Sequence, residues 1–178
     1  MHGIAVERPQ NTGCCIVASR TAWLLADDFD ERLFLIFEDS DWSMRAAARG
    51  VQLVVARDCQ LLHHVSRSFR SRSAGLLATF YFARNGLVFS FRHRRRFTMK
   101  FAWKWVLKPV ARSVVRRDDF RRAALLCAGA LAAGSGQRGR APKAVDMLVA
   151  DRGFLRARRD SGLWARAGGD GVDDSGLA

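Results

Sequence analysis

The longest apolar stretch of the chain, from Ala74 to Phe91, most constrains how it can fold. It is too long for an ordinary strand and predicts a helix. The polar pair Arg84 and Asn85 interrupts it, whereas a membrane-crossing helix needs about 20 apolar residues. We therefore expect this helix to lie inside a folded domain, where Arg84 packs against an acidic group.

The segment before this helix alternates short apolar runs with acidic and turn-forming residues, which is typical of a mixed α/β fold. Short apolar runs predict buried strands. Acidic residues favour a helix start at Glu38, and Gly50 is a typical helix end. The expected elements are strands at Cys14–Ser19 and Val51–Ala56, a strand-like run at Leu33–Phe37, helical turns at Thr21–Ala26 and a helix from Glu38 to about Arg49.

The segment after Phe91 is predicted to be mostly helical. Its expected helices are Phe97–Lys108, stopped or kinked by Pro109, and Val110–Gly134, interrupted near Asp118. Residues 135–143 form a Gly/Arg/Pro-rich loop, and a Gly/Asp-rich tail follows Gly162. The sequence therefore divides into a mixed α/β domain at 1–91, a basic helical region at 92–143 and a tail at 144–178.

Charge is distributed unevenly along the 178 residues. Residues 1–91 carry ten Lys/Arg and nine Asp/Glu, whereas residues 92–178 carry twenty and eight, so nearly all of the net charge of +13 lies in the second half. Cations recur every four residues, at Lys100, Lys104, Lys108, Arg112 and Arg116, among Phe and Trp side chains. This pattern favours an anionic membrane surface. A solvated charged face and nucleic acid are the alternatives, and nucleic acid is less favoured because no nucleic-acid-binding motif is present.

Cysteine and leader patterns indicate a cytoplasmic protein. The four cysteines have no metal or redox spacing and are expected to be reduced apolar residues. The first twelve residues contain no apolar run typical of a signal peptide.

Five carboxylates lie between Asp30 and Asp41, and the later ones stand where an apolar run meets a helix start. A carboxylate fixed at such a junction, with like charges nearby to raise its pKa, suits general base catalysis. The alternative is that Asp39 or Ser40 only caps the helix, which would keep Asp39 ionised.

The same region resembles a longer signature. Gly13 precedes the run Cys14–Ser19, and the chain continues with Phe29-Asp30-Glu31-Arg32-Leu33-Phe34, Glu38-Asp39-Ser40-Asp41-Trp42, Arg45-Ala46 and Gly50. In order and spacing these segments resemble the family 2 glycosyltransferases of the GT-A fold, especially rhamnosyltransferase-like members. Tyr81–Asn85 and the small-residue run Leu125–Leu131 also resemble that family, so the resemblance covers residues 11–143. Asp28 departs from the Gly usual there.

The resemblance implies roles for the acidic residues. Asp39 would be the catalytic base that deprotonates the acceptor hydroxyl in an inverting displacement, and Glu38 would support it or contact the acceptor. Asp41, Trp42, Asp30 and Glu31 would shape the acceptor site. Arg45 is expected to pair with Asp41 four residues earlier on the helix, a structural role.

His63-His64-Val65-Ser66-Arg67-Ser68 resembles a later family segment. It implies that His63, or His64 in the alternative register, contacts a divalent metal, Mn2+ or Mg2+. Ser66 and Arg67 would bind the diphosphate of the donor. Arg84 would pack against this diphosphate region if it does not meet an acidic group of the core.

The resemblance thus implies an α/β fold, the acceptor-side half of a Rossmann-like GT-A catalytic domain followed by a mostly α-helical region. The expected activity is transfer of a sugar from a nucleotide-sugar donor to a glycan or lipid-linked acceptor, in cell-surface polysaccharide synthesis at the cytoplasmic face of the inner membrane. The chain carries no Asp-x-Asp motif before Gly13, so we expect it to be truncated and to lack the donor-binding half. The alternative is a non-catalytic membrane-surface or partner-binding protein derived from such an enzyme.

Overall fold

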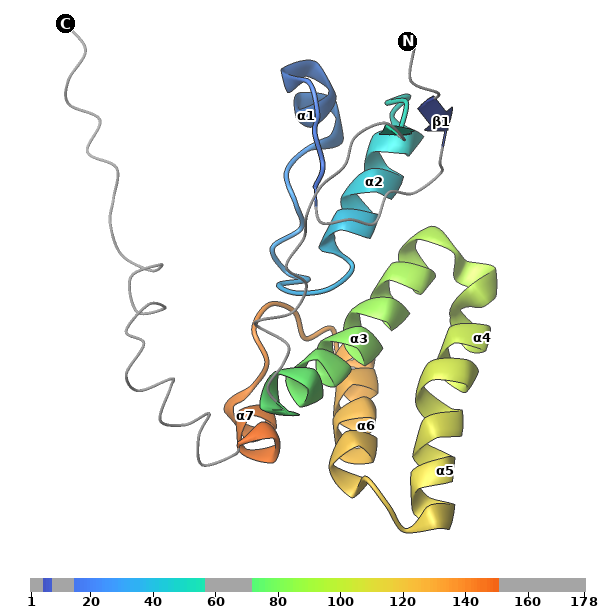
Figure 1. Ribbon diagram of the computed structural model, residues 1–178, viewed down its shortest axis with the longest axis vertical. Coiled ribbons are helices and arrows are strands. Elements are labelled where there is room, and N and C mark those ends of the chain that lie inside the picture. Colours follow the sequence, from blue (N-terminus) through green and yellow to red (C-terminus); the bar gives the residue numbers. More distant parts are fainter. Residues whose placement is uncertain (1–4, 8–14, 57–71, 151–178) are drawn as a thin grey trace, which may run out of the picture.

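A computed structural model describes residues 5–7, 15–56 and 72–150 (Figure 1). The described part is mostly helical. Its elements in chain order are β1 (Ala5–Glu7), α1 (Arg20–Ala26), α2 (Glu38–Ala48), β2 (Val54–Ala56), α3 (Arg72–His93), a 3-10 turn (Arg95–Phe97), α4 (Thr98–Ala102), a π turn (Trp103–Leu107), α5 (Lys108–Arg116), α6 (Phe120–Gly134) and α7 (Lys143–Val149).

The expected α/β fold with a Rossmann-like sheet is wrong for the described residues. Their only strands are β1 and β2, three residues each, which pair antiparallel with Val6 opposite Val55. The run from Cys15 to Ser19 has no regular structure, and Val17 is 92% exposed. Residues 33–37 form turns and bends. A short apolar run alone therefore does not specify a strand, because the same residues can form a loop.

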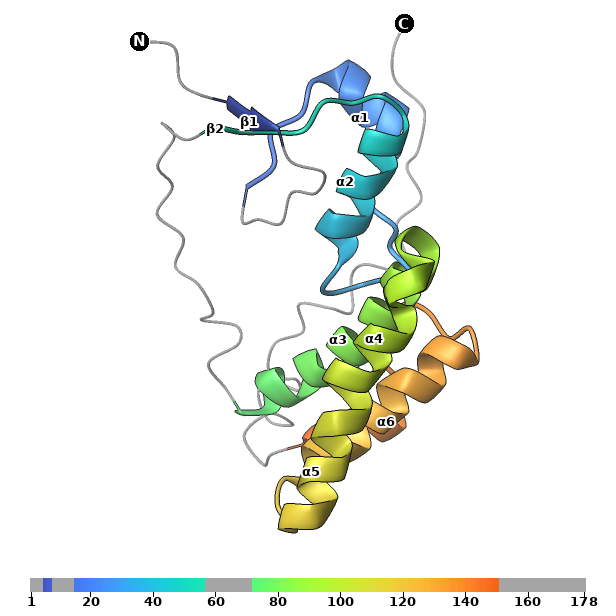
Figure 2. The same ribbon diagram turned by 90° about the vertical axis from the view of Figure 1, so that its right-hand side faces the viewer.

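α3 is the central element of the helical part (Figures 1 and 2). It confirms the predicted helix at Ala74–Phe91, and α6 packs along it. A Cβ built on Gly129 of α6 would lie 2.5 Å from the Phe80 carbonyl oxygen of α3, so the two helices approach closely only because this residue is glycine. The domain boundary expected at residues 91 and 92 falls within the last turn of α3.

α4, the π turn and α5 form one continuous helical rod, seen from two sides in Figures 1 and 2. Pro109 lies just inside α5 and does not end the rod as expected. Proline has no backbone N–H and its ring crowds the carbonyl four residues earlier. The π turn before it widens the helix, and the Lys108 N–H donates to the Trp103 carbonyl five residues back. The proline is thus accommodated without a break.

A second core lies around α1 and α2. Trp42, 1% exposed, packs with Ala26, Ala46 and Leu53. Ser19 caps α1 by accepting from the Ala22 N–H at 3.1 Å, which confirms the helical turns predicted there. α2 begins at the predicted Glu38, and Gly50 follows its end with φ +85°. Within the described residues no helix is long and apolar enough to cross a membrane.

Candidate acid–base site

Glu38 and Asp39 are the first two residues of α2. The helix N-cap is Phe37, whose side chain makes no capping bond, so neither Asp39 nor Ser40 is the cap. Asp39 instead accepts at Oδ1 from the next backbone N–H, that of Ser40, at 2.6 Å. Both carboxylates therefore lie at the positive end of the helix macrodipole.

Glu38 is the unusual carboxylate of the pair. Burial raises its pKa, and the charge of neighbouring Asp39 raises it further, against a backbone hydrogen bond of its own residue. Its Oε2 atom is buried and has no hydrogen-bond partner among the described residues. A carboxyl group in this state holds a proton more readily than an exposed one.

The loop that leads into this pair is strained. Phe34, Ile36 and Phe37 have φ between +63° and +76°, a region that side chains other than glycine seldom adopt. The strain is greatest for β-branched Ile36. Conformations of this kind persist only where surrounding contacts hold them, and they concentrate at functional sites.

Those contacts come from Arg84 and Asn85 of α3. The Asn85 amide donates to the carbonyls of Leu33, Leu35 and Ile36 at 2.6 to 2.9 Å. The Arg84 guanidinium donates to Leu33 at 3.0 Å. We call this pair and the carbonyls it binds the loop clamp. It fixes the backbone immediately before Glu38.

Arg84 has no acidic partner within the described residues, so the expected pairing with an acidic group is wrong there. Its guanidinium is buried and donates to the Gly139 carbonyl at 2.6 Å and to the Asn85 side chain at 2.8 Å. It also faces the rings of Phe80 and Tyr81. Burial lowers the pKa of Arg84. Carbonyl dipoles and aromatic faces thus replace the carboxylate that a buried cation usually requires.

Asp41 is fully buried and serves as an ion-pair centre. Its carboxylate accepts from Arg45 at 2.9 Å, which confirms the predicted pairing, and from Arg92 and His93 at 2.7 Å each. Burial alone would raise the pKa of Asp41, but hydrogen bonds from these three side chains outweigh it and lower the pKa. Because Arg92 and His93 end α3, this network joins α2 to α3.

Asp30 belongs to the same network. It pairs with Arg32 at 2.7 Å and with Arg92 at 3.0 Å. Burial would raise its pKa, but the hydrogen bonds from Arg32 and Arg92 outweigh it and bring the pKa to about 2. Asp30 and Asp41 are therefore held ionised, unlike Glu38.

A polar cleft of about 520 Å3 opens above this network, lined by residues 27–32 with Arg45, Arg49 and Arg92. Of the expected acceptor residues, Asp30 and exposed Glu31 line it. Asp41 and Trp42 are buried, and no described residue accepts a hydrogen bond from the Trp42 indole N–H. Neither Glu38 nor Asp39 lines this cleft.

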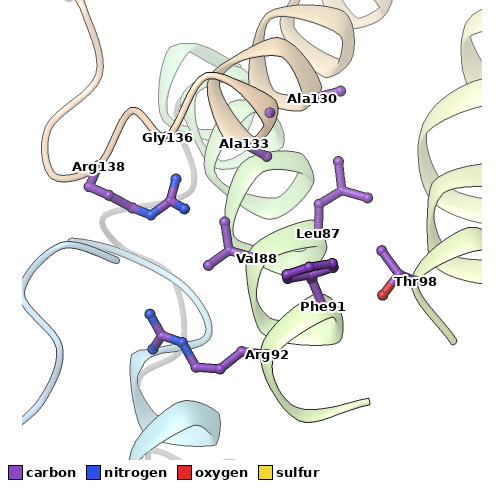
Figure 3. A pocket seen from close by; sticks show the side chains of 10 residues that line it. Leu87, Val88, Phe91, Arg92, Thr98, Ala130, Ala133, Gly136 and Arg138 are labelled. Atoms are coloured by element: carbon purple, nitrogen blue, oxygen red, sulfur yellow. The ribbon is translucent and has the colours of Figure 1, made fainter. Parts of the chain in front are cut away.

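A larger, mainly apolar pocket of about 790 Å3 lies between α3, α4 and α6 (Figure 3). Leu87, Val88 and Phe91 of α3 form one wall, and small residues of α6 form another. The guanidinium groups of Arg92 and Arg138 lie at one side (Figure 3). No pattern in the sequence pointed to this pocket, because its walls come from three separate helices.

The expected metal and diphosphate ligands His63, His64, Ser66 and Arg67 lie outside the described residues. Among the residues that the structure describes, no three His, Cys, Asp or Glu side chains gather as a metal site.

Comparison with known proteins gave no match to a family model, to a curated protein or to a solved structure.

Proposed function

We propose that this chain contributes the acceptor-activating part of an inverting glycosyltransferase, with Asp39 as general base and Glu38 as its partner. The observation that carries the proposal is the contrast between carboxylates. Asp30 and Asp41 are held ionised by arginines, whereas Glu38 has a raised pKa and an unpartnered oxygen beside Asp39. A base needs a carboxylate that can take up a proton near neutral pH.

The chemistry is a single displacement. The acceptor hydroxyl oxygen attacks the anomeric carbon of the sugar, and the bond from that carbon to the nucleoside diphosphate breaks with its electron pair. The hydroxyl proton passes to the Asp39 carboxylate. Glu38, next to Asp39 in the first turn of α2, would support the base or contact the acceptor.

The loop clamp supports this assignment because a base must be fixed in position. Three residues with positive φ precede Glu38, and Asn85 binds the carbonyls of Leu33, Leu35 and Ile36 around them. The hydrogen bonds that hold this strained loop also fix the orientation of the first turn of α2. Residues that only capped the helix would not require a strained loop before them.

The apolar pocket favours a lipid-linked acceptor over a free sugar. Its walls of Leu87, Val88 and Phe91 suit an apolar chain, and the guanidinium groups of Arg92 and Arg138 suit an anionic head. The Thr98 hydroxyl also lines the pocket, is buried without a hydrogen-bond partner in the described part of the chain, and suits a polar group of such a ligand.

The test uses the native polypeptide, purified through a terminal tag from the cells that make it, with extracted membrane lipids as acceptor. Release of nucleoside diphosphate is measured against a panel of nucleotide sugars. We expect release by the wild type and a loss of at least about 100-fold in Asp39→Asn. Asp118→Asn, an exposed carboxylate on the α5–α6 turn, is the matched control and retains activity. Release that Asp39→Asn leaves unchanged would refute the proposal.

A non-catalytic basic membrane-surface or partner-binding protein is the second candidate. The exposed Trp103 and Trp105 on the α4–α5 rod favour it. If this second candidate is right, the chain releases no nucleoside diphosphate from any nucleotide sugar but does bind vesicles.

A further inference from the structure

The α4–α5 rod belongs to a segment without a single acidic residue. From Arg72 to Arg117 the sequence contains twelve Lys/Arg and no Asp or Glu. Within the rod Lys100, Lys104 and Lys108 are exposed at intervals of four residues. Residues four apart share one side of a helix, so these ammonium groups line up along the rod.

Large apolar side chains are exposed beside these cations. Trp103 is 63% exposed, Met99 76% and Val115 83%, and Phe97, Trp105, Leu107 and Val114 are also exposed. The lysines contact the aromatic rings directly, since Lys104 Nζ lies 4.9 Å from the Trp105 ring centre. Isolated apolar residues are normal on a surface, but a run of this kind along one rod marks an interaction site.

The other side of the rod is already occupied. Val106 is buried against Ala83 and Leu126, and Phe101 fits against Gly86 of α3, where a Cβ would meet its ring. One edge of the partly exposed Trp105 also meets Phe82 of α3, with ring centres 5.6 Å apart. The rod is therefore anchored by one side, and Trp103, Met99 and the lysines lie on the exposed remainder.

We propose that the outward side of α4–α5 binds the surface of a bilayer that contains anionic phospholipid, with the rod lying in the interface. The ammonium groups would contact lipid phosphates, and the aromatic and aliphatic groups would enter the boundary between head groups and acyl chains. Tryptophan prefers this boundary because its ring is apolar and its N–H polar. The proposal does not depend on the proposed glycosyl transfer.

Aliphatic exposure favours a membrane over a nucleic acid. Phosphate contacts require only the cations, and base stacking requires only aromatic rings. Exposed Met99, Leu107, Val114 and Val115 contribute to neither, whereas each adds apolar area that a bilayer can bury.

The test is co-sedimentation of the full chain with vesicles of phosphatidylcholine alone or with about one third phosphatidylglycerol. We expect binding to the anionic vesicles at least ten times tighter than to the neutral ones. Trp103→Ala with Trp105→Ala, and separately Lys100→Glu with Lys104→Glu, should each weaken anionic-vesicle binding at least tenfold. Matched controls on α1, Leu24→Ala and Arg20→Glu, change exposed residues of the same chemistry and should bind as the wild type does.

Two outcomes overturn the proposal. One is equal binding by the wild type and both double variants. The other is salt-sensitive binding to duplex DNA that the tryptophan variant retains, with no vesicle binding, which would assign the surface to nucleic acid. The four substituted side chains are exposed. Circular dichroism melting serves as the control for whether each variant folds. Asp39→Asn should bind vesicles normally, so failure of the proposed function and failure of this inference are distinguishable.

Discussion

Glu38 is a residue at which function and stability oppose each other. Burial disfavours its charge, so at neutral pH the ionised side chain lowers the free energy of unfolding. We predict that Glu38→Gln raises the free energy of unfolding at pH 7 by roughly 0.5–1 kcal/mol while it reduces turnover. Urea denaturation and the diphosphate-release assay measure the two effects.

The raised pKa of Glu38 also predicts how the stability difference between Glu38→Gln and the wild type changes with pH. The pKa of Glu38 is higher in the folded chain than in the unfolded chain, so the wild type gains stability as pH falls through the folded pKa. The stability difference between Glu38→Gln and the wild type should therefore shrink on acidification. A difference that grows as pH falls would show that the Glu38 charge is stabilised by the fold.

Asn85 holds the loop clamp through three carbonyls. Asn85→Ala leaves the carbonyls of Leu33, Leu35 and Ile36 without this donor, and the strained loop without its restraint. We predict a loss of about 2–3 kcal/mol in the free energy of unfolding by urea denaturation. Gln137→Ala is the control, because the Gln137 side-chain amide makes no hydrogen bond within the described residues. Equal losses in both variants would contradict the clamp.

Residue-level expectations were correct where both partners lie on one helix. Spacing alone predicted the Arg45–Asp41 pair, since residues four apart meet on a helix. The backbone carbonyls of Gly139 and Leu33, to which Arg84 donates, lie 55 and 51 positions away, and no side-chain pattern encodes them. The adjacency of Glu38 and Asp39 was evident in the sequence, whereas the loop clamp that positions them required the fold.

At the scale of elements, the contact between α3 and α6 depends on one glycine. A Cβ at position 129 would meet the Phe80 carbonyl oxygen at 2.5 Å and the Ala83 Cβ at 2.9 Å, and backbone cannot yield as a flexible side chain can. We predict that Gly129→Ala lowers the free energy of unfolding by about 2 kcal/mol or more, measured by thermal or urea denaturation.

The same helix supplies the control. Gly134 ends α6, and a Cβ there would meet nothing within 4 Å. Alanine favours a helix over glycine by about 0.5–1 kcal/mol, so Gly134→Ala should be neutral or slightly stabilising. If Gly129→Ala and Gly134→Ala change the free energy of unfolding equally, the close packing of α6 on α3 does not depend on glycine at position 129.

Long helices were predicted well and strands poorly, for a physical reason. The helices at α2 and α3 were evident because a start signal or a long apolar stretch specifies them locally. A strand needs a partner elsewhere in the chain, so the runs at Cys14–Ser19 and Leu33–Phe37 could equally form loops packed on helices. Pro109 was misjudged because a π turn, which depends on the whole rod, accommodates it.

At the scale of the whole molecule, the α1–α2 part is joined to the helical part by the loop clamp and by the ion network. Arg92 pairs with both Asp30 and Asp41, and so links the loop before α2, α2 itself and the end of α3. These ion pairs join the α1–α2 part to the helical part only while the Asp30 and Asp41 carboxylates are ionised.

This requirement gives an acid-stability prediction. The pKa of Asp30 is about 2 in the folded chain against an ordinary value of 3.8, so its contribution is fully present above pH 4 and is lost as pH falls through 2. Because Arg32 is largely exposed and solvent screens its part of the interaction, we expect this contribution to be on the order of 1–2 kcal/mol. Asp30→Asn should therefore be less stable than the wild type by that amount at pH 7, and the difference should vanish near pH 2. Urea denaturation from pH 2 to 7 measures it, with exposed Asp118→Asn as the control. A difference that persists at pH 2 would mean that Asp30 stabilises the fold by packing or hydrogen bonding rather than through its charge, and the Asp30–Arg92 ion pair would then not be what joins the loop before α2 to α3.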